Sequence, residues 1–208
     1  MIGEKEFSEP QVKIIKKLAS EIRPQHSADW LRQRMESLLA KQVLAKPASK
    51  WGWKEPNTHI LLDQLQRVIP DLKYIHVVRN GLDMAHSTNQ NQLKFWGSQF
   101  LGADYEISPY YSLRYWHTVH QHVIAIGESM GPRFLLFNND DFCLNPTNSI
   151  DNLLSFLEVD VSDTQISNLL NLVRIPKSIG RFKKYSLEIF DPSDIKFVEE
   201  LGFDTSIK

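Results

Sequence analysis

The sequence has a single cysteine and no long apolar run. Cys143 has no partner elsewhere in the 208 residues, so an internal disulfide is excluded and we expect a reducing, cytoplasmic compartment. No apolar run approaches the length of a membrane span, and the amino terminus lacks the charged-then-apolar pattern of a signal peptide. These absences predict a protein without a membrane partner.

Neither sign of charge is in excess. The chain has 24 lysine and arginine residues against 25 aspartate and glutamate residues, for a formal net charge of -1. This balance offers no general attraction for nucleic acid, so we expect no nucleic-acid partner, and any anion site must be local. With 42% hydrophobic and 24% charged residues, the composition is typical of one folded domain spanning 1–208.

Glycine is scarce in the first quarter of the chain. Gly3 is the only glycine before Gly52, so no glycine-rich phosphate loop lies between them. The glycine-rich Lys-Ser/Thr loop of many phosphoryl-transfer enzymes is also missing, which argues against that class. Apolar residues at helical spacing predict instead two helices within 1–50, which we interpret as a cover for a sheet.

The most informative stretch begins with the apolar run Tyr74–Val78. Its β-branched and aromatic residues predict a strand buried on both faces of a parallel sheet. Arg79 follows directly, Asn80 is a good helix N-cap, and a helix is expected from Leu82 onward. At such a sheet edge the guanidinium of Arg79 suits a phosphate, and Ser87 would lie on the helical stripe that faces the same ligand.

The rest of the chain alternates between helical and strand patterns. Phe134–Phe137 predicts a second buried strand, and 95–111 has the composition of a long loop. Asp140 and Asp141 follow this second strand, and we interpret them as structural. Helices are expected at 58–68, 111–130, 149–157, 163–172 and 194–201.

Three segments of the chain resemble the sulfotransferase family that uses 3′-phosphoadenosine 5′-phosphosulfate (PAPS). In that family a hydrophobic strand is followed by an arginine and, eight residues later, a serine, a pattern that Arg79 and Ser87 match. A Lys-x-Pro precedes the helix leading into that strand, as Lys54 does here in Trp-Lys-Glu-Pro. A later segment with a serine and a Gly-Arg is similar to Ser178-Ile-Gly-Arg181.

The resemblance implies a three-layer α/β/α fold with a mostly parallel central sheet, related to that of P-loop nucleotidases, with 51–203 as its core. It implies that Arg79, Ser87 and Arg181 bind the 3′-phosphate of PAPS, the donor. Lys54 would be the catalytic residue, because a fixed ammonium stabilises charge on the transferring sulfuryl group, and Ser178 would approach that group beside it. The acceptor would be a hydroxyl or amine of a small molecule, glycan or protein.

No metal is expected in this chemistry. His117 and His120 could share a helix face, but no carboxylate or thiol accompanies them in the sequence. The general base cannot be assigned. Glu55 adjoins Lys54 and is a candidate, although a surface salt bridge would explain it equally well.

One departure from the family leaves the function open. The first strand and the phosphate loop that hold the 5′-phosphosulfate have no counterpart before Lys54. The chain could be truncated or mis-started, another route could replace the loop, or catalysis could be lost. We therefore expect a sulfotransferase, with a catalytically silent nucleotide-binding or protein-interaction domain as the alternative. The sequence also leaves open whether the chain forms a homo-oligomer.

Overall fold

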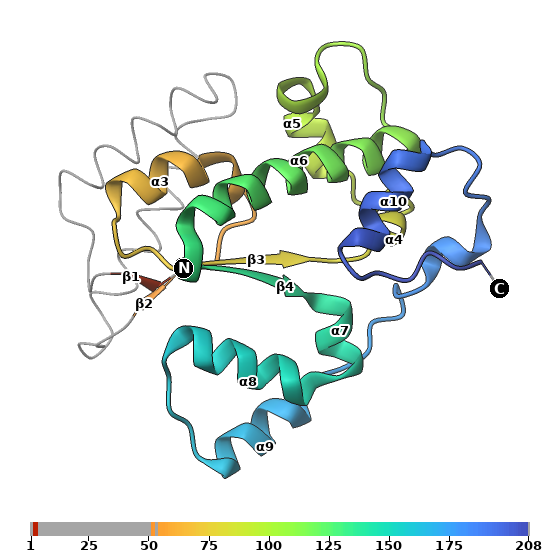
Figure 1. The fold of residues 1–208 in the computed structure, drawn as a ribbon. Helices are drawn as coiled ribbons and strands as arrows, with labels where there is room; N and C mark the ends of the chain where they lie inside the picture. Colours follow the sequence, from red (N-terminus) through yellow and green to blue (C-terminus); the bar gives the residue numbers. More distant parts are fainter. Residues whose placement is uncertain (1, 4–50, 53, 208) are drawn as a thin grey trace. The chain divides into compact units, whose positions relative to one another are not determined.

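The computed structural model describes residues 2–3, 51–52 and 54–207 (Figure 1). The two helices expected within 1–50 lie outside these residues. Contacts divide the chain into two compact units. Unit 1 comprises Met1–His76 and Ile126–Leu135, and unit 2 comprises Val77–Ala125 and Leu136–Lys208. That the chain folds as one domain stays a prediction.

The two strands expected from the sequence form a parallel pair. Strand β3 (Tyr74–Val78) lies beside β4 (Phe134–Asn138), and Figure 1 shows both arrows running in the same direction. In β3, Tyr74, His76 and Val78 are buried, whereas Val77 is 53% exposed. Since alternate side chains of a strand point to opposite faces, only one face of β3 is buried. The expectation of burial on both faces is therefore wrong.

A second strand pair is short. Strand β1 (Ile2–Gly3) pairs in antiparallel register with β2 (Trp51–Gly52), with Ile2 opposite Gly52.

In the described part of unit 1, a helix leads into β3. The expected helix at 58–68 is a 3-10 turn, η1 (Thr58–Leu61), continued by α3 (Leu62–Val68). After α3, the guanidinium of Arg133 donates to the carbonyl oxygens of Pro70 at 2.7 Å and Leu72 at 3.4 Å. Arg133 ends the short 3-10 turn η2 (Gly131–Arg133), just before β4. These bonds tie the entry of β3 to the entry of β4.

Among the remaining described α-helices, two were not expected from the sequence, namely those at Asn91–Leu101 and Asn139–Leu144. The expected loop over 95–111 is mostly helical, because α5 (Asn91–Leu101) buries Leu93 and Trp96 one turn apart. The loop is limited to 102–108. The other helices are α4 (Gly81–Ala85), α6 (Pro109–Met130), α7 (Asn139–Leu144), α8 (Pro146–Leu157), α9 (Asp163–Leu172), the 3-10 turn η3 (Arg181–Lys184) and α10 (Pro192–Glu200).

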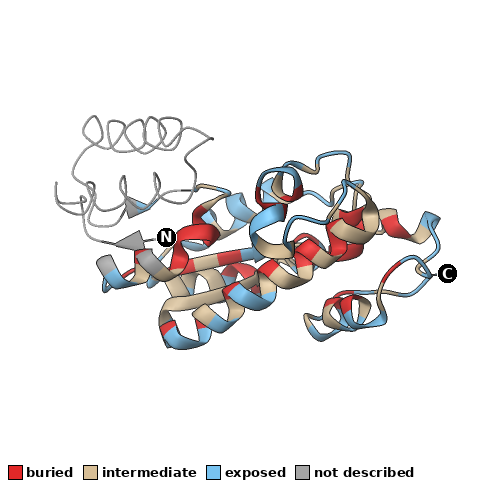
Figure 2. Ribbon diagram, turned by 90° about the horizontal axis from the view of Figure 1, so that it is seen from above, coloured by how far each residue is buried: buried red, intermediate tan, exposed pale blue. Residues whose placement is uncertain are grey.

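The core of unit 2 joins segments that are far apart in the sequence, and Figure 2 colours its buried residues red. Trp116 of α6 packs on Gly81, the first residue of α4, so closely that a Cβ there would lie 2.8 Å from the indole. The buried members of this core are Val78, Leu82, Ala85, Leu113, Trp116, Phe182, Phe190, Val198 and Phe203. Among the described residues, no helix is both long and apolar enough to cross a bilayer.

Candidate functional site

The carboxyl end of β3 forms a tight corner into α4. Asn80 caps this helix, since its Oδ1 accepts a hydrogen bond of 2.9 Å from the N–H of Leu82. Its amide nitrogen donates to the carbonyl of Asp204 at 2.8 Å. The predicted N-cap is confirmed, and it fixes the direction in which the chain leaves Arg79.

Helix α4 ends at Ala85, so the expectation that Ser87 lies on its helical stripe is wrong. The cause is Gln90, whose side-chain amide donates to the carbonyl oxygens of Met84, Ala85 and Ser87 at 3.1, 3.2 and 2.7 Å. These carbonyls are the ones that a continuing helix would use. Ser87 therefore lies in the turn after α4, where its Oγ accepts from the N–H of Asn89 at 3.2 Å.

A buried carboxylate ties the later basic segment to α4. Asp83, only 4% exposed, accepts from the N–H of Gly180 at 2.8 Å and from the N–H of Phe182 at 2.9 Å. Gly180 has a φ of 77°, a conformation that glycine adopts without strain. The segment from Ser178 to Phe182 is thereby held against α4.

This arrangement places the predicted ligand-binding residues of unit 2 around one corner. Nη2 of Arg79 donates to Ser178 Oγ at 2.7 Å. Nη1 of Arg181 makes longer bonds, each of 3.4 Å, to the carbonyls of Asp83 and His86, the latter next to Ser87. Both arginines are half-buried, and within the described part of the chain neither forms an ion pair with a carboxylate.

Lys54 belongs to unit 1, whereas Arg79, Ser87, Ser178 and Arg181 belong to unit 2. The side chain of Lys54 is exposed, and the residue lies before η1 in the chain.

The neighbouring Glu55 has a local role. Its Oε1 accepts from the backbone N–H and the side-chain amide of Asn57, at 3.3 and 3.0 Å. Glu55 thus closes the turn that leads into η1.

No pattern in the sequence connects Asp83 or His86 with the basic segment. The imidazole of His86 stacks on Tyr185 with ring centroids 3.9 Å apart and an angle of 8° between the rings, and the edge of Phe190 lies nearby. Burial lowers the pKa of His86, an effect that nearby Asp83 opposes. Asp83 lies in the first turn of α4, but no local pattern reveals its bond to Gly180, 97 positions later.

A second polar cluster joins α6 to α10. His117 Nδ1 lies 2.6 Å from a carboxylate oxygen of Asp194, which is fully buried, and Arg114 contacts both Asp194 and Asp191, at 3.2 and 2.8 Å. A carboxylate therefore does accompany His117 in the fold, contrary to the sequence interpretation. Even so, within the part of the chain that the structure describes, no group of histidine, cysteine and acidic side chains is arranged to hold a metal ion.

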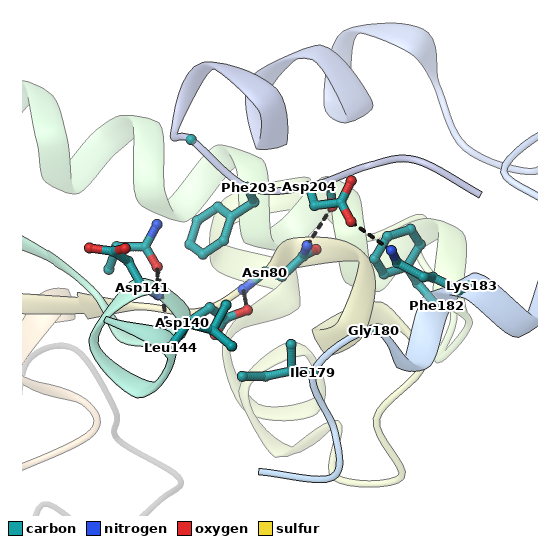
Figure 3. Close-up of a pocket in the computed structure, with 12 residues that line it drawn as sticks. Asn80, Asp140, Asp141, Leu144, Ile179, Gly180, Phe182, Lys183, Phe203 and Asp204 are labelled. Carbon is teal, nitrogen blue, oxygen red and sulfur yellow. Dashed lines mark hydrogen bonds and ion pairs between the residues drawn. The ribbon is translucent and has the colours of Figure 1, made fainter. Parts of the chain in front are cut away.

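A pocket of about 480 Å³ opens in unit 2 at the ends of β3 and β4 (Figure 3). It lies next to the corner described above, because Asn80, Ile179 and Gly180 line it. Its other lining residues are Asn138, Asp140, Asp141, Leu144, Phe182, Lys183, Gly202, Phe203 and Asp204.

Comparison with known proteins points to one family. Residues 4–163 match the model of the sulfotransferase family. The match starts well before Lys54 and so includes most of 1–50, which precedes the expected core 51–203. It ends before Ser178 and Arg181. No curated protein matches the chain.

The fold agrees with that family. A sulfotransferase domain from the curacin biosynthetic pathway has a similar structure, with a TM-score of 0.55 and 14% sequence identity, over 91% of this chain and 78% of that one. The predicted α/β fold of the sulfotransferase type is confirmed.

Proposed function

Since the chain belongs to the sulfotransferase family, we propose that it transfers a sulfuryl group from PAPS to a hydroxyl or amine. The observation that supports this most directly is the corner after β3. There the guanidinium of Arg79 bonds to Ser178, and that of Arg181 lies against the end of α4. Two cations without carboxylate partners in the described part of the chain suit an anion with several oxygens.

In this proposal Arg79, Arg181 and Ser87 hold the 3′-phosphate. We move Ser178, expected from the sequence at the sulfuryl group, to the 3′-phosphate as well, because its Oγ accepts from Arg79 at 2.7 Å. Guanidinium groups donate paired hydrogen bonds to phosphate oxygens. Ser178 Oγ accepts from Arg79, and Ser87 Oγ accepts from the N–H of Asn89, so each hydroxyl proton can be donated to the anion. Ligands of open α/β sheets bind at the carboxyl ends of strands, where this corner lies.

The proposed reaction needs a cation at the sulfuryl group, a role that we assign to Lys54. The oxygen or nitrogen of the acceptor attacks sulfur, and the bond from sulfur to the bridging phosphate oxygen breaks. The electron pair leaves with that oxygen, and the acceptor proton passes to a base or to solvent. An ammonium group stabilises the charge that develops on the leaving oxygen. We propose that the acceptor is a hydroxyl or amine on a small molecule, glycan or protein. The single cysteine supports a reducing, cytoplasmic compartment as the setting of the reaction.

Transfer of radiolabelled sulfate from PAPS to a panel of alcohols and amines tests this proposal. We expect transfer by the wild-type chain, and a loss of at least about a hundredfold in Lys54→Ala, the order that removal of one preorganised charge-stabilising donor causes. Lys94→Ala, which removes an exposed lysine of α5, is the matched control and should keep full activity. Equal activity of both variants would overturn the role of Lys54.

The alternative is a catalytically silent nucleotide-binding domain. It is favoured by the absence of glycine between Gly3 and Gly52, where the family's phosphate loop is expected. Binding of 3′-phosphoadenosine 5′-phosphate without transfer to any acceptor would support this alternative and contradict the enzymatic proposal.

A further inference from the structure

The carbonyl end of α4 is covered by two side chains that come from elsewhere in the chain. Nη1 of Arg181 donates to two of the carbonyl oxygens of 83–87, at 3.4 Å each. The side-chain amide of Gln90 shares its two protons among the other three, at 2.7 to 3.2 Å. Each of these five consecutive carbonyls therefore has a donor from one of the two side chains.

Gln90 stands where α5 begins. It occupies the N-cap position of that helix, yet among the described residues its side chain makes no capping bond to α5. N-cap positions favour shorter side chains such as serine or asparagine, whose oxygen accepts from the first N–H groups of the helix. The side chain of Gln90 turns back to the end of α4 instead, so its role lies with α4.

Ser112 of α6 holds the Gln90 side chain in this orientation. The hydroxyl of Ser112 donates to Gln90 Oε1 at 2.8 Å. Ser112 is only 5% exposed, so this anchor lies in the interior. With its oxygen bound to Ser112, Gln90 presents its amide nitrogen to the carbonyls of α4.

The bonds of Gln90 matter for a phosphate, because carbonyl oxygens repel an anion. The last carbonyls of a helix carry partial negative charge and have no partner within the helix. A phosphate held by Arg181 would lie close to this end of α4, since Arg181 itself contacts two of the carbonyls. The amide of Gln90 covers the other three and so reduces their repulsion of the anion.

The same amide fixes the position of Ser87. The carbonyl oxygen of Ser87 accepts the shortest of the three Gln90 bonds, 2.7 Å, and its Oγ accepts from the N–H of Asn89 at 3.2 Å. Both the backbone and the side chain of Ser87 are thus held in the turn after α4. A hydroxyl that is already fixed loses less conformational freedom when it donates to a ligand.

We propose that Gln90, anchored by Ser112, is a positioning residue of the nucleotide site and contributes to its selectivity for a 3′-phosphate. It acts through Ser87 and through the carbonyls that it covers. This inference rests on the proposed function, because it assumes that the corner with Arg79 and Arg181 binds the 3′-phosphate. It adds a residue that lies outside the arginine and serine pattern of that corner.

Calorimetry of the full chain with 3′-phosphoadenosine 5′-phosphate and with adenosine 5′-phosphate measures this selectivity as a ratio of affinities. Gln90→Met keeps the length of the side chain and removes its donors, so the ratio should fall about two- to tenfold, the effect of one lost hydrogen bond. Gln90→Glu also adds a negative charge near the phosphate, so the ratio should fall at least as far. The affinity for adenosine 5′-phosphate should stay the same in both variants, whereas a general loss of structure would weaken both nucleotides.

Gln121→Met and Gln121→Glu, at an exposed position of α6, are the matched controls and should keep the wild-type ratio. Ser112→Ala removes the anchor but leaves the amide of Gln90, so it should lower the ratio by a smaller factor. It tests the proposal even if both Gln90 variants fail to fold.

An undiminished ratio in Gln90→Met or in Ser112→Ala would overturn the role of Gln90, as would an equal weakening of both nucleotides. These outcomes leave the proposed function intact, because the wild type would still prefer the 3′-phosphate. A ratio of one in the wild type would instead overturn the 3′-phosphate site itself, and this inference with it.

Discussion

Arg79 and Ser178 are separated by 99 positions in the sequence, yet Nη2 of Arg79 donates to Ser178 Oγ at 2.7 Å. This bond joins two segments that match the family pattern independently, the strand-to-helix corner and the later basic segment. It also explains how residues beyond the end of the family match can belong to the same site. The contact is made possible by Asp83, which holds the backbone of the basic segment.

Asp83 should therefore be required for nucleotide binding as well as for stability. In Asp83→Asn the amide nitrogen faces a backbone N–H, so one buried donor loses its acceptor at a cost of about 1–3 kcal/mol. Urea unfolding should show this loss, and calorimetry should show that the affinity for 3′-phosphoadenosine 5′-phosphate falls. Asp151→Asn, on the exposed side of α8, should change neither quantity. Wild-type affinity in Asp83→Asn would show that the basic segment keeps its place without this carboxylate.

Gly81 should tolerate no side chain. A Cβ at this position would lie 2.8 Å from Trp116 and 2.9 Å from Leu113, both buried in the core of unit 2. Because neither side chain has free space to move into, Gly81→Ala should lower the free energy of unfolding by about 1–3 kcal/mol, the usual cost of overpacking. The midpoint of urea unfolding measures this change, and an unchanged midpoint would mean that α4 can shift away from α6.

Acidification should destabilise the protein through His76. Burial, with a smaller effect from His59, lowers the pKa of His76 to about 3. Between that value and about 6.5 the unfolded chain binds a proton that the folded chain rejects, so stability is present above about 6.5 and falls by up to about 1.4 kcal/mol per unit as the pH decreases. Urea unfolding between pH 7 and pH 4 measures this slope.

His76→Gln removes the titrating group and provides the comparison. Its stability should depend less steeply on pH over the same range. If the two proteins lost stability in parallel, the pH dependence would have to come from other groups.

The sequence predicted the fold better than it predicted the site geometry. Strong apolar patterns placed β3, β4, α6 and α9 within a few residues of their observed bounds. Helix α5 was missed because its polar amide residues hide the two buried positions, Leu93 and Trp96.

Within the site, side-chain hydrogen bonds determine positions that the sequence patterns did not predict. Gln90 bonds to the last carbonyls of α4 and so places Ser87 in a turn, and Asp83 bonds across the fold to Gly180 and Phe182. No periodicity or spacing reports such contacts.

The central claim is that the corner formed by Arg79, Ser178 and Arg181 binds a 3′-phosphate. Calorimetry should compare 3′-phosphoadenosine 5′-phosphate with adenosine 5′-phosphate, which lacks only that group. The control variant is Arg174→Ala, since this exposed arginine donates to the carbonyls of Asn171 and Val173.

In the wild type and in Arg174→Ala, we predict that the 3′-phosphate strengthens binding by about ten- to a hundredfold, the effect of one or two charge-assisted bonds. In Arg79→Ala most of this difference should vanish, while the weaker affinity for adenosine 5′-phosphate stays the same. Equal affinities for the two nucleotides in the wild type, or an undiminished difference in Arg79→Ala, would contradict the account.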